Sequence, residues 1–104
     1  MKITPPATGP EALAWVQEAL TGRRYVVGTH FMDRLADRDI PWRAAWHAIH
    51  NARACAPYAP DRGAIAGGTC WRITGPDHEG TATSVGVEAF VDHLGRRALL
   101  VTVF

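Results

Sequence analysis

The spacing of apolar residues changes partway along the chain, from a helical period to strict alternation. Near the start, Ala12, Val16 and Leu20 recur every four residues, which is the period of one helix face. Pro10 suits the first turn of a helix and Gly22 suits the position just after its end. The pattern therefore predicts a first helix between these two residues.

Two more helical segments are expected before the midpoint of the chain. The stretch 25–28 reads as a short extended connector, and Thr29 is a good N-cap for the helix that follows. Pro41 separates this helix from a third one, because the residue before a proline disfavours helical geometry. The apolar stripes are Phe31, Leu35 and Ala36 in the second helix and Trp42, Ala45, Trp46 and Ile49 in the third.

Alternation replaces this period in the second half of the chain. The stretch 56–68 is rich in proline and glycine, which predicts a loop with at most one edge strand. Three strands are expected at 69–75, 82–91 and 96–104, and their short connections require antiparallel neighbours. The expected fold class is α+β, with N-terminal helices packed on a C-terminal antiparallel sheet of three to four strands. The single domain 1–104 then comprises an irregular lead-in at 1–10, a helical part at 11–52 and the sheet at 53–104.

The alternation also assigns two faces to the expected sheet. We expect the apolar face to pack against the helices, and the polar face to be either solvated or the floor of a site. The apolar face carries Trp71, Ile73, Val85, Val87, Val91, Leu99, Val101 and Val103, and the polar face carries Cys70, Arg72, Thr74, Ser84, Gly86, Glu88, Leu100 and Thr102.

Composition narrows the function only slightly. The net charge is +1, which gives no bulk electrostatic case for nucleic acid, but the basic residues are ten arginines and one lysine. Arginine can hold a phosphate with two parallel hydrogen bonds, which lysine cannot. The chain has no long apolar stretch, so we expect no membrane span and a cytoplasmic location, or delivery into a target cell as part of a larger toxin.

Metal binding has little support in the sequence. His47 and His50 are three residues apart on the third helix, a spacing that can bind a metal ion. No cysteine and histidine spacing matches a zinc motif, since Cys55 and Cys70 stand far apart. We therefore expect no metal and no cofactor.

The sharpest local pattern is His30-x3-Arg34-x3-Arg38 on the second helix. Spacings of four place the three side chains on one side of the helix. An imidazole can transfer protons near neutral pH, and two guanidinium groups can hold a phosphate and stabilise developing charge. The alternative is a solvated face on which the arginines pair with Asp33, Asp37 or Asp39.

The order of these features resembles a family of short bacterial domains related to the BrnT and RelE toxins. The matching features are His30, Arg34, Arg38, the strand between Gly68 and Gly75, and Thr102 near the end of the chain. This family belongs to the superfamily that groups barnase, EndoU, colicin and RelE folds and contains many ribonucleases. The chain departs from RelE itself, because it has one lysine and lacks a tyrosine in its last strand.

The resemblance implies a metal-independent RNA endonuclease toxin that cleaves by attack of the ribose 2′-hydroxyl. His30 would be the general acid or base, Arg34 and Arg38 would hold the phosphate, and Arg72 and Thr102 would support the substrate. The implied partners are an RNA substrate and a cognate antitoxin or immunity protein. The alternative is a non-catalytic protein-binding module, such as an immunity protein, an antitoxin or a regulator.

Overall fold

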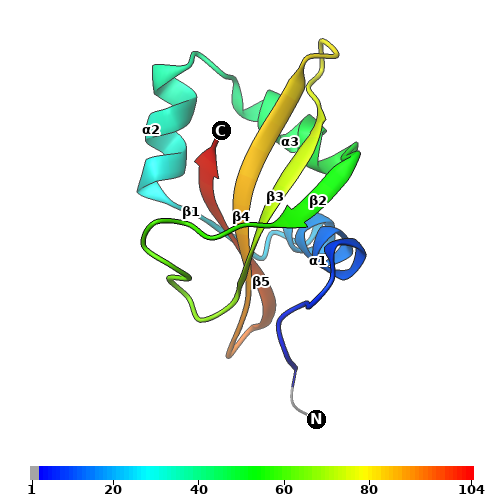
Figure 1. Ribbon diagram of the computed structural model, residues 1–104, viewed down its shortest axis with the longest axis vertical. Helices are drawn as coiled ribbons and strands as arrows, with labels where there is room; N and C mark the ends of the chain where they lie inside the picture. Colours follow the sequence, from blue (N-terminus) through cyan, green and yellow to red (C-terminus); the bar gives the residue numbers. More distant parts are fainter. Residues whose placement is uncertain (1–2) are drawn as a thin grey trace.

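A computed structural model describes residues 3–104 of the chain, and it confirms the α+β class (Figure 1). Among these residues, no helix is both long enough and apolar enough to cross a membrane. The elements in chain order are α1 (Gly9–Thr21), β1 (Tyr25–Val27), α2 (Thr29–Asp37), α3 (Trp42–His50), β2 (Ala54–Pro57), β3 (Thr69–Pro76), β4 (Ala82–Asp92) and β5 (Gly95–Val103).

The sheet differs from the expected one in strand number and in direction. Its five strands lie in the order β1-β5-β4-β3-β2, and β1 runs parallel to β5 while the other neighbours are antiparallel. The predicted number of strands, three to four, was therefore too low, and the prediction that all strands are antiparallel was wrong for the pair β1 and β5. The extra strand is the stretch that was expected to be a connector, with Tyr25 opposite Ala98 and Val27 opposite Leu100. Three residues are too few to show a period of two, and the partner strand is remote in sequence.

An irregularity in β5 changes which of its residues face the core. Val85 lies opposite Val103, but Val87 lies opposite Leu100, so β5 carries one extra residue between these two pairs. Because of this extra residue, the side chains on one side of the bulge lie on the opposite faces from those expected for a regular strand. Leu100 is therefore buried at 1% exposure, whereas Leu99, which was expected on the core face, lies on the other one. The predicted faces of Leu99 and Leu100 were wrong for this reason, and Val101, which was expected on the core face, is the unpaired residue of the bulge and is only half-buried.

The core forms where the apolar sides of the helices meet one face of the sheet. Helix α3 lies so close to β3 that a side chain on Gly75 would collide with the carbonyl oxygen of Ala48. Glycine at this position allows the close approach. Each fully buried large side chain stabilises the fold by about 1.5–3 kcal/mol. Trp42 and Trp46 are only partly buried, at the margin of this core. The large side chains that are almost wholly buried include Phe31, Leu20, Ile49, Ile73, Leu100, Val85 and Val87.

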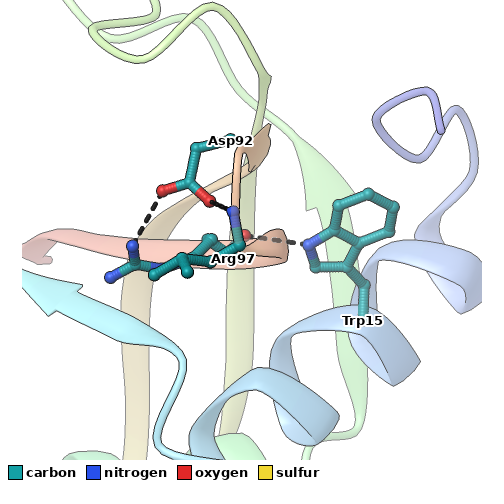
Figure 2. Close-up of polar contacts among 4 residues, drawn as sticks. Trp15, Asp92 and Arg97 are labelled. Carbon is teal, nitrogen blue, oxygen red and sulfur yellow. Dashed lines mark hydrogen bonds and ion pairs between the residues drawn. The ribbon is translucent and has the colours of Figure 1, made fainter. Parts of the chain in front are cut away.

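Helix α1 is tied to the hairpin of β4 and β5 by a polar chain (Figure 2). The indole Nε1 of Trp15 donates to the carbonyl oxygen of Arg97 at 2.9 Å, and Arg97 Nη1 donates to Asp92 Oδ2 at 2.8 Å. The other oxygen of Asp92 accepts from the backbone N–H of Leu94 at 2.8 Å. Desolvation opposes ionisation of Asp92, but the Leu94 N–H and the Arg97 guanidinium outweigh it and lower the pKa of Asp92.

Candidate functional site

Helix α2 separates an apolar side from a polar flank. Phe31 and Leu35 are buried at 0% and 7% exposure, which turns that side of the helix toward the core. His30 and Arg34 each precede one of these residues, so they share the adjacent flank. The Nε–H of Arg34 points at Nε2 of His30 over 3.4 Å, a long contact, and His30 is exposed. The spacing of four residues thus places an imidazole and a guanidinium side by side at the protein surface.

Arg38 lies just beyond the last turn of this helix. It is the C-cap of α2, is exposed, and its backbone N–H donates to the carbonyl oxygen of Arg34 at 3.1 Å. Within residues 3–104, no ion pair joins Arg34 or Arg38 to an aspartate. The alternative in which the aspartates of this segment neutralise the two arginines therefore has no support among the described contacts.

Arg72 and Thr102 share the sheet face that turns away from the helical core. They lie on β3 and β5, both opposite Gly86 of β4, which stands between them. Neighbouring strands are about 4.8 Å apart, so the two backbones are about 10 Å apart. A side chain on Gly86 would come within 2.7 Å of the Tyr58 hydroxyl, so this phenol lies directly over the gap.

Aromatic groups pack around Arg72 on this face. Its guanidinium carbon lies 4.3 Å from the centre of the Phe104 ring, and Phe104 meets Tyr58 edge-on with ring centres 5.4 Å apart. Burial, followed by the charges of Cys70 and Glu88, raises the pKa of Tyr58 to about 12. The phenol is therefore neutral at pH 7 and is a poor candidate for a general base. A cation above an aromatic ring is attracted to it, which orients the Arg72 side chain.

Glu88 has a structural task that the sequence analysis did not assign. It is 0% exposed, and its carboxylate accepts three backbone hydrogen bonds from the loop between β2 and β3. The donors are the N–H groups of Ile65 at 2.7 Å and of Ala66 and Gly68 at 2.8 Å each. Successive amides of this kind form a small anion-binding concavity. The carboxylate therefore holds the loop across the sheet, on the side opposite α1 and α3 (Figure 1).

The one sequence signal for Glu88 was its place in an otherwise apolar stretch of β4. A lone carboxylate there must find donors, since an unpaired buried charge is very costly. Its neighbour across the sheet is Cys70. Burial, followed by the charge of Glu88, raises the pKa of the Cys70 thiol. That thiol is protonated at neutral pH, which argues against a role as a nucleophile.

The structure thus places the predicted site residues in two sets. His30 and Arg34 meet on α2, with Arg38 after its end, while Arg72 and Thr102 share a sheet face. Helix α2 packs beside β5, the strand that carries Thr102 (Figure 1). In the part of the chain that the structure describes, no hydrogen bond or ion pair connects the two sets. A ligand that contacted both sets would have to bridge them.

The two histidines of α3 have different surroundings. His47 Nδ1 lies 2.8 Å from the carbonyl oxygen of Pro76, a backbone contact that orients the ring. The His50 ring packs against Trp46 with centres 5.2 Å apart, and burial lowers the pKa of His50. Over residues 3–104, no three or more side chains of histidine, cysteine, aspartate or glutamate gather as metal ligands would.

Comparison with protein families, with curated proteins and with solved structures finds no match to this chain.

Proposed function

We propose that this protein is a small endoribonuclease that cleaves RNA without a metal ion. The observation that carries the proposal is the exposed His30–Arg34 pair, with 3.4 Å between Arg34 Nε and His30 Nε2. A proton-transfer group beside a phosphate-binding group can catalyse the attack of a ribose 2′-hydroxyl on the adjacent phosphate without a metal ion. The resemblance of the sequence to the BrnT and RelE toxins also favours this proposal, and the α+β class of the fold is compatible with it.

In the proposed reaction, the ribose 2′-hydroxyl attacks the adjacent phosphorus and the bond to the 5′-oxygen breaks. His30 takes the proton from the 2′-hydroxyl or returns one to the leaving oxygen. The oxygens of phosphorus gain negative charge as the new bond forms, and Arg34 and Arg38 bind these oxygens. The products are a 2′,3′-cyclic phosphate and a 5′-hydroxyl.

Arg72 and Thr102 act as supporting groups in this proposal. The Arg72 guanidinium is exposed and held over Phe104, which suits contact with the flexible backbone of a single strand. Thr102 adds a hydroxyl on the same face. A producing cell would need protection from such an activity, so the proposed partners are RNA and a cognate antitoxin or immunity protein.

Incubation of the purified protein with total RNA in EDTA, followed by end-group analysis, tests the proposal. We expect cyclic phosphate ends, and a rate loss of about 10²- to 10⁴-fold in His30→Ala. His93→Ala removes another exposed histidine from the β4–β5 turn and should cleave like the wild type. Cleavage that EDTA abolishes would contradict the mechanism, and no cleavage of any RNA, tRNA included, would contradict the activity.

A second candidate is a non-catalytic protein-binding module. It is favoured by exposed apolar side chains on and before α2, where Met32 is 51% exposed and Val27 is 36% exposed. The net charge of +1 also gives RNA little general attraction. Expression in bacteria separates the two: growth arrest that His30→Ala relieves supports the enzyme, and harmless expression supports the binding module.

A further inference from the structure

Strand β1 is an edge of the sheet with one side of its backbone unused. On the side facing β5, the carbonyl oxygen of Arg24 accepts from the backbone N–H of Ala98 at 3.2 Å. The backbone N–H of Gly28 donates to the carbonyl oxygen of Leu100 at 2.9 Å. Along a strand, the backbone N–H and C=O groups of successive residues point alternately to one neighbouring strand and to the other. Those of Tyr25 and Val27 therefore point away from β5. In the described part of the chain, no other strand pairs with β1.

Two cavities lie along this edge, and each is lined by one of these two residues. A cavity of about 750 Å³ is bounded by Val27, Met32 and Trp42, among others. A second, of about 480 Å³, is bounded by Tyr25 and Trp46, among others. Residues two apart on a strand point to the same side. The two cavities therefore lie beside alternate positions of β1, on the same side of the sheet.

Aromatic side chains line both cavities, Trp42 in the larger one and Tyr25 and Trp46 in the smaller one. Tyr25 stacks on Trp42 with ring centres 6.0 Å apart, and Trp42 and Trp46 follow each other at 6.1 Å. Proteins usually protect an edge strand with charged side chains, with proline or with a covering segment. Here the edge residue Val26 is itself 41% exposed. Strand β1 thus carries two exposed valines, Val26 and Val27, and no charged side chain or proline, which suits it to a partner strand.

The two cavities carry opposite charges. Arg23 lines the smaller cavity and Asp39 lines the larger one. Both side chains are exposed, and neither forms an ion pair with any residue between 3 and 104. Both residues follow the end of a helix and have positive φ, at 57° and 52°. The backbone conformation at each residue fixes the direction of its side chain. The positive charge therefore lies at the smaller cavity and the negative charge at the larger one.

We propose that the β1 edge binds an extended segment of a protein partner, which adds to the sheet as an antiparallel strand. Its hydrogen bonds would be made with Tyr25 and Val27. An apolar side chain opposite Val27 would enter the larger cavity, and an acidic side chain two residues later would lie opposite Tyr25, near Arg23. A basic side chain two residues before the apolar one would approach Asp39. The partner motif is thus basic-x-apolar-x-acidic, and this proposal does not depend on RNA cleavage.

A synthetic peptide of the sequence Thr-Lys-Thr-Leu-Thr-Glu-Thr, capped at both ends, is the probe. Titrated into the ¹⁵N-labelled protein, it should give saturable shifts at the Tyr25 and Val27 amides and at the Trp42 and Trp46 indoles. Exchanging its lysine and glutamate should weaken binding about two- to fivefold for each charge pair lost. N-methylation of the leucine amide should weaken it about three- to tenfold or more, because a strand hydrogen bond is lost.

Protein variants give the matched comparison. Arg23→Glu should lower the affinity for the original peptide and raise the affinity for the charge-exchanged peptide. Arg53→Glu makes the same charge change beside β2, at the opposite edge, and should leave binding unchanged. Each variant is checked for a native spectrum before titration.

Three results would overturn the proposal. One is the absence of saturable shifts at Tyr25 and Val27. Another is binding that is indifferent to N-methylation and to Arg23→Glu. The third is a concentration-dependent dimer, seen by sedimentation, in which the β1 amides are protected from exchange without peptide. That last result would assign the edge to a second copy of the chain.

Discussion

The two faces of the sheet are covered in different ways. On the core face, Ile73, Val85 and Val87 are each 0% exposed beneath the helices, and the contact is mainly between apolar side chains. On the opposite face, a loop is held by three hydrogen bonds to the carboxylate of Glu88. The first cover spreads its stabilisation over many contacts, and the second concentrates it in one group. Changes on the core face should therefore affect the whole fold, while changes at Glu88 should affect the loop first.

The largest effect is expected from Ile73→Ala on the core face. Ile73 is 0% exposed, and truncation of a buried isoleucine to alanine costs about 2–5 kcal/mol. A chemical melt should show this loss in the free energy of unfolding, with the same truncation at the exposed Val26 as the control. A loss below about 1 kcal/mol would mean that this face is not the main core.

Glu88→Gln should have the next largest effect. An amide keeps the shape but replaces one acceptor oxygen with a donor, so buried N–H groups of the loop lose their partner at a cost of about 1–3 kcal/mol. Amide exchange at Ile65, Ala66 and Gly68 should accelerate more than exchange in the core strands. Glu79→Gln, at an exposed turn residue, is the control. Unchanged loop exchange in Glu88→Gln would contradict the comparison between the faces.

Tyr58→Phe should be nearly neutral or slightly stabilising. Its hydroxyl is buried and has no hydrogen-bond partner among the described residues, so its removal relieves a desolvation cost of up to about 1 kcal/mol. The ring contacts with Phe104 and Gly86 are retained. A chemical melt checks this. A loss above about 1 kcal/mol would instead indicate that the hydroxyl is hydrogen-bonded in solution.

The smallest effect concerns acid. The pKa of Asp92 is lowered from its ordinary 3.8, so the folded state holds its proton less tightly than the unfolded one. Its contribution is present at pH values above 3.8 and is lost as the pH falls through the lower folded value. Asp92→Asn should therefore reduce the slope of stability against pH in acid. An unchanged slope would show that neither the Leu94 N–H nor the Arg97 guanidinium holds the carboxylate of Asp92 in solution.

Much of the fold could be predicted locally. The three helices and the strands β3, β4 and β5 were expected near their observed positions, because period and turn residues are properties of short stretches. The meeting of His30 and Arg34 follows in the same way from their spacing of four on one helix. Whether these residues cleave RNA remains a prediction, as does the support from Arg72 and Thr102.

The α+β class, the helical periods and the contact between neighbours along α2 can thus be derived from short stretches of sequence. Three features depend on the folded chain: residues 25–27 form a strand, β5 carries a bulge, and the carboxylate of Glu88 binds the amides of a loop. Each of these depends on a partner distant in sequence: β5 for β1, β4 for the bulge, and the loop amides for the carboxylate. A local pattern records which side chains a segment offers, but not which remote backbone groups will meet them.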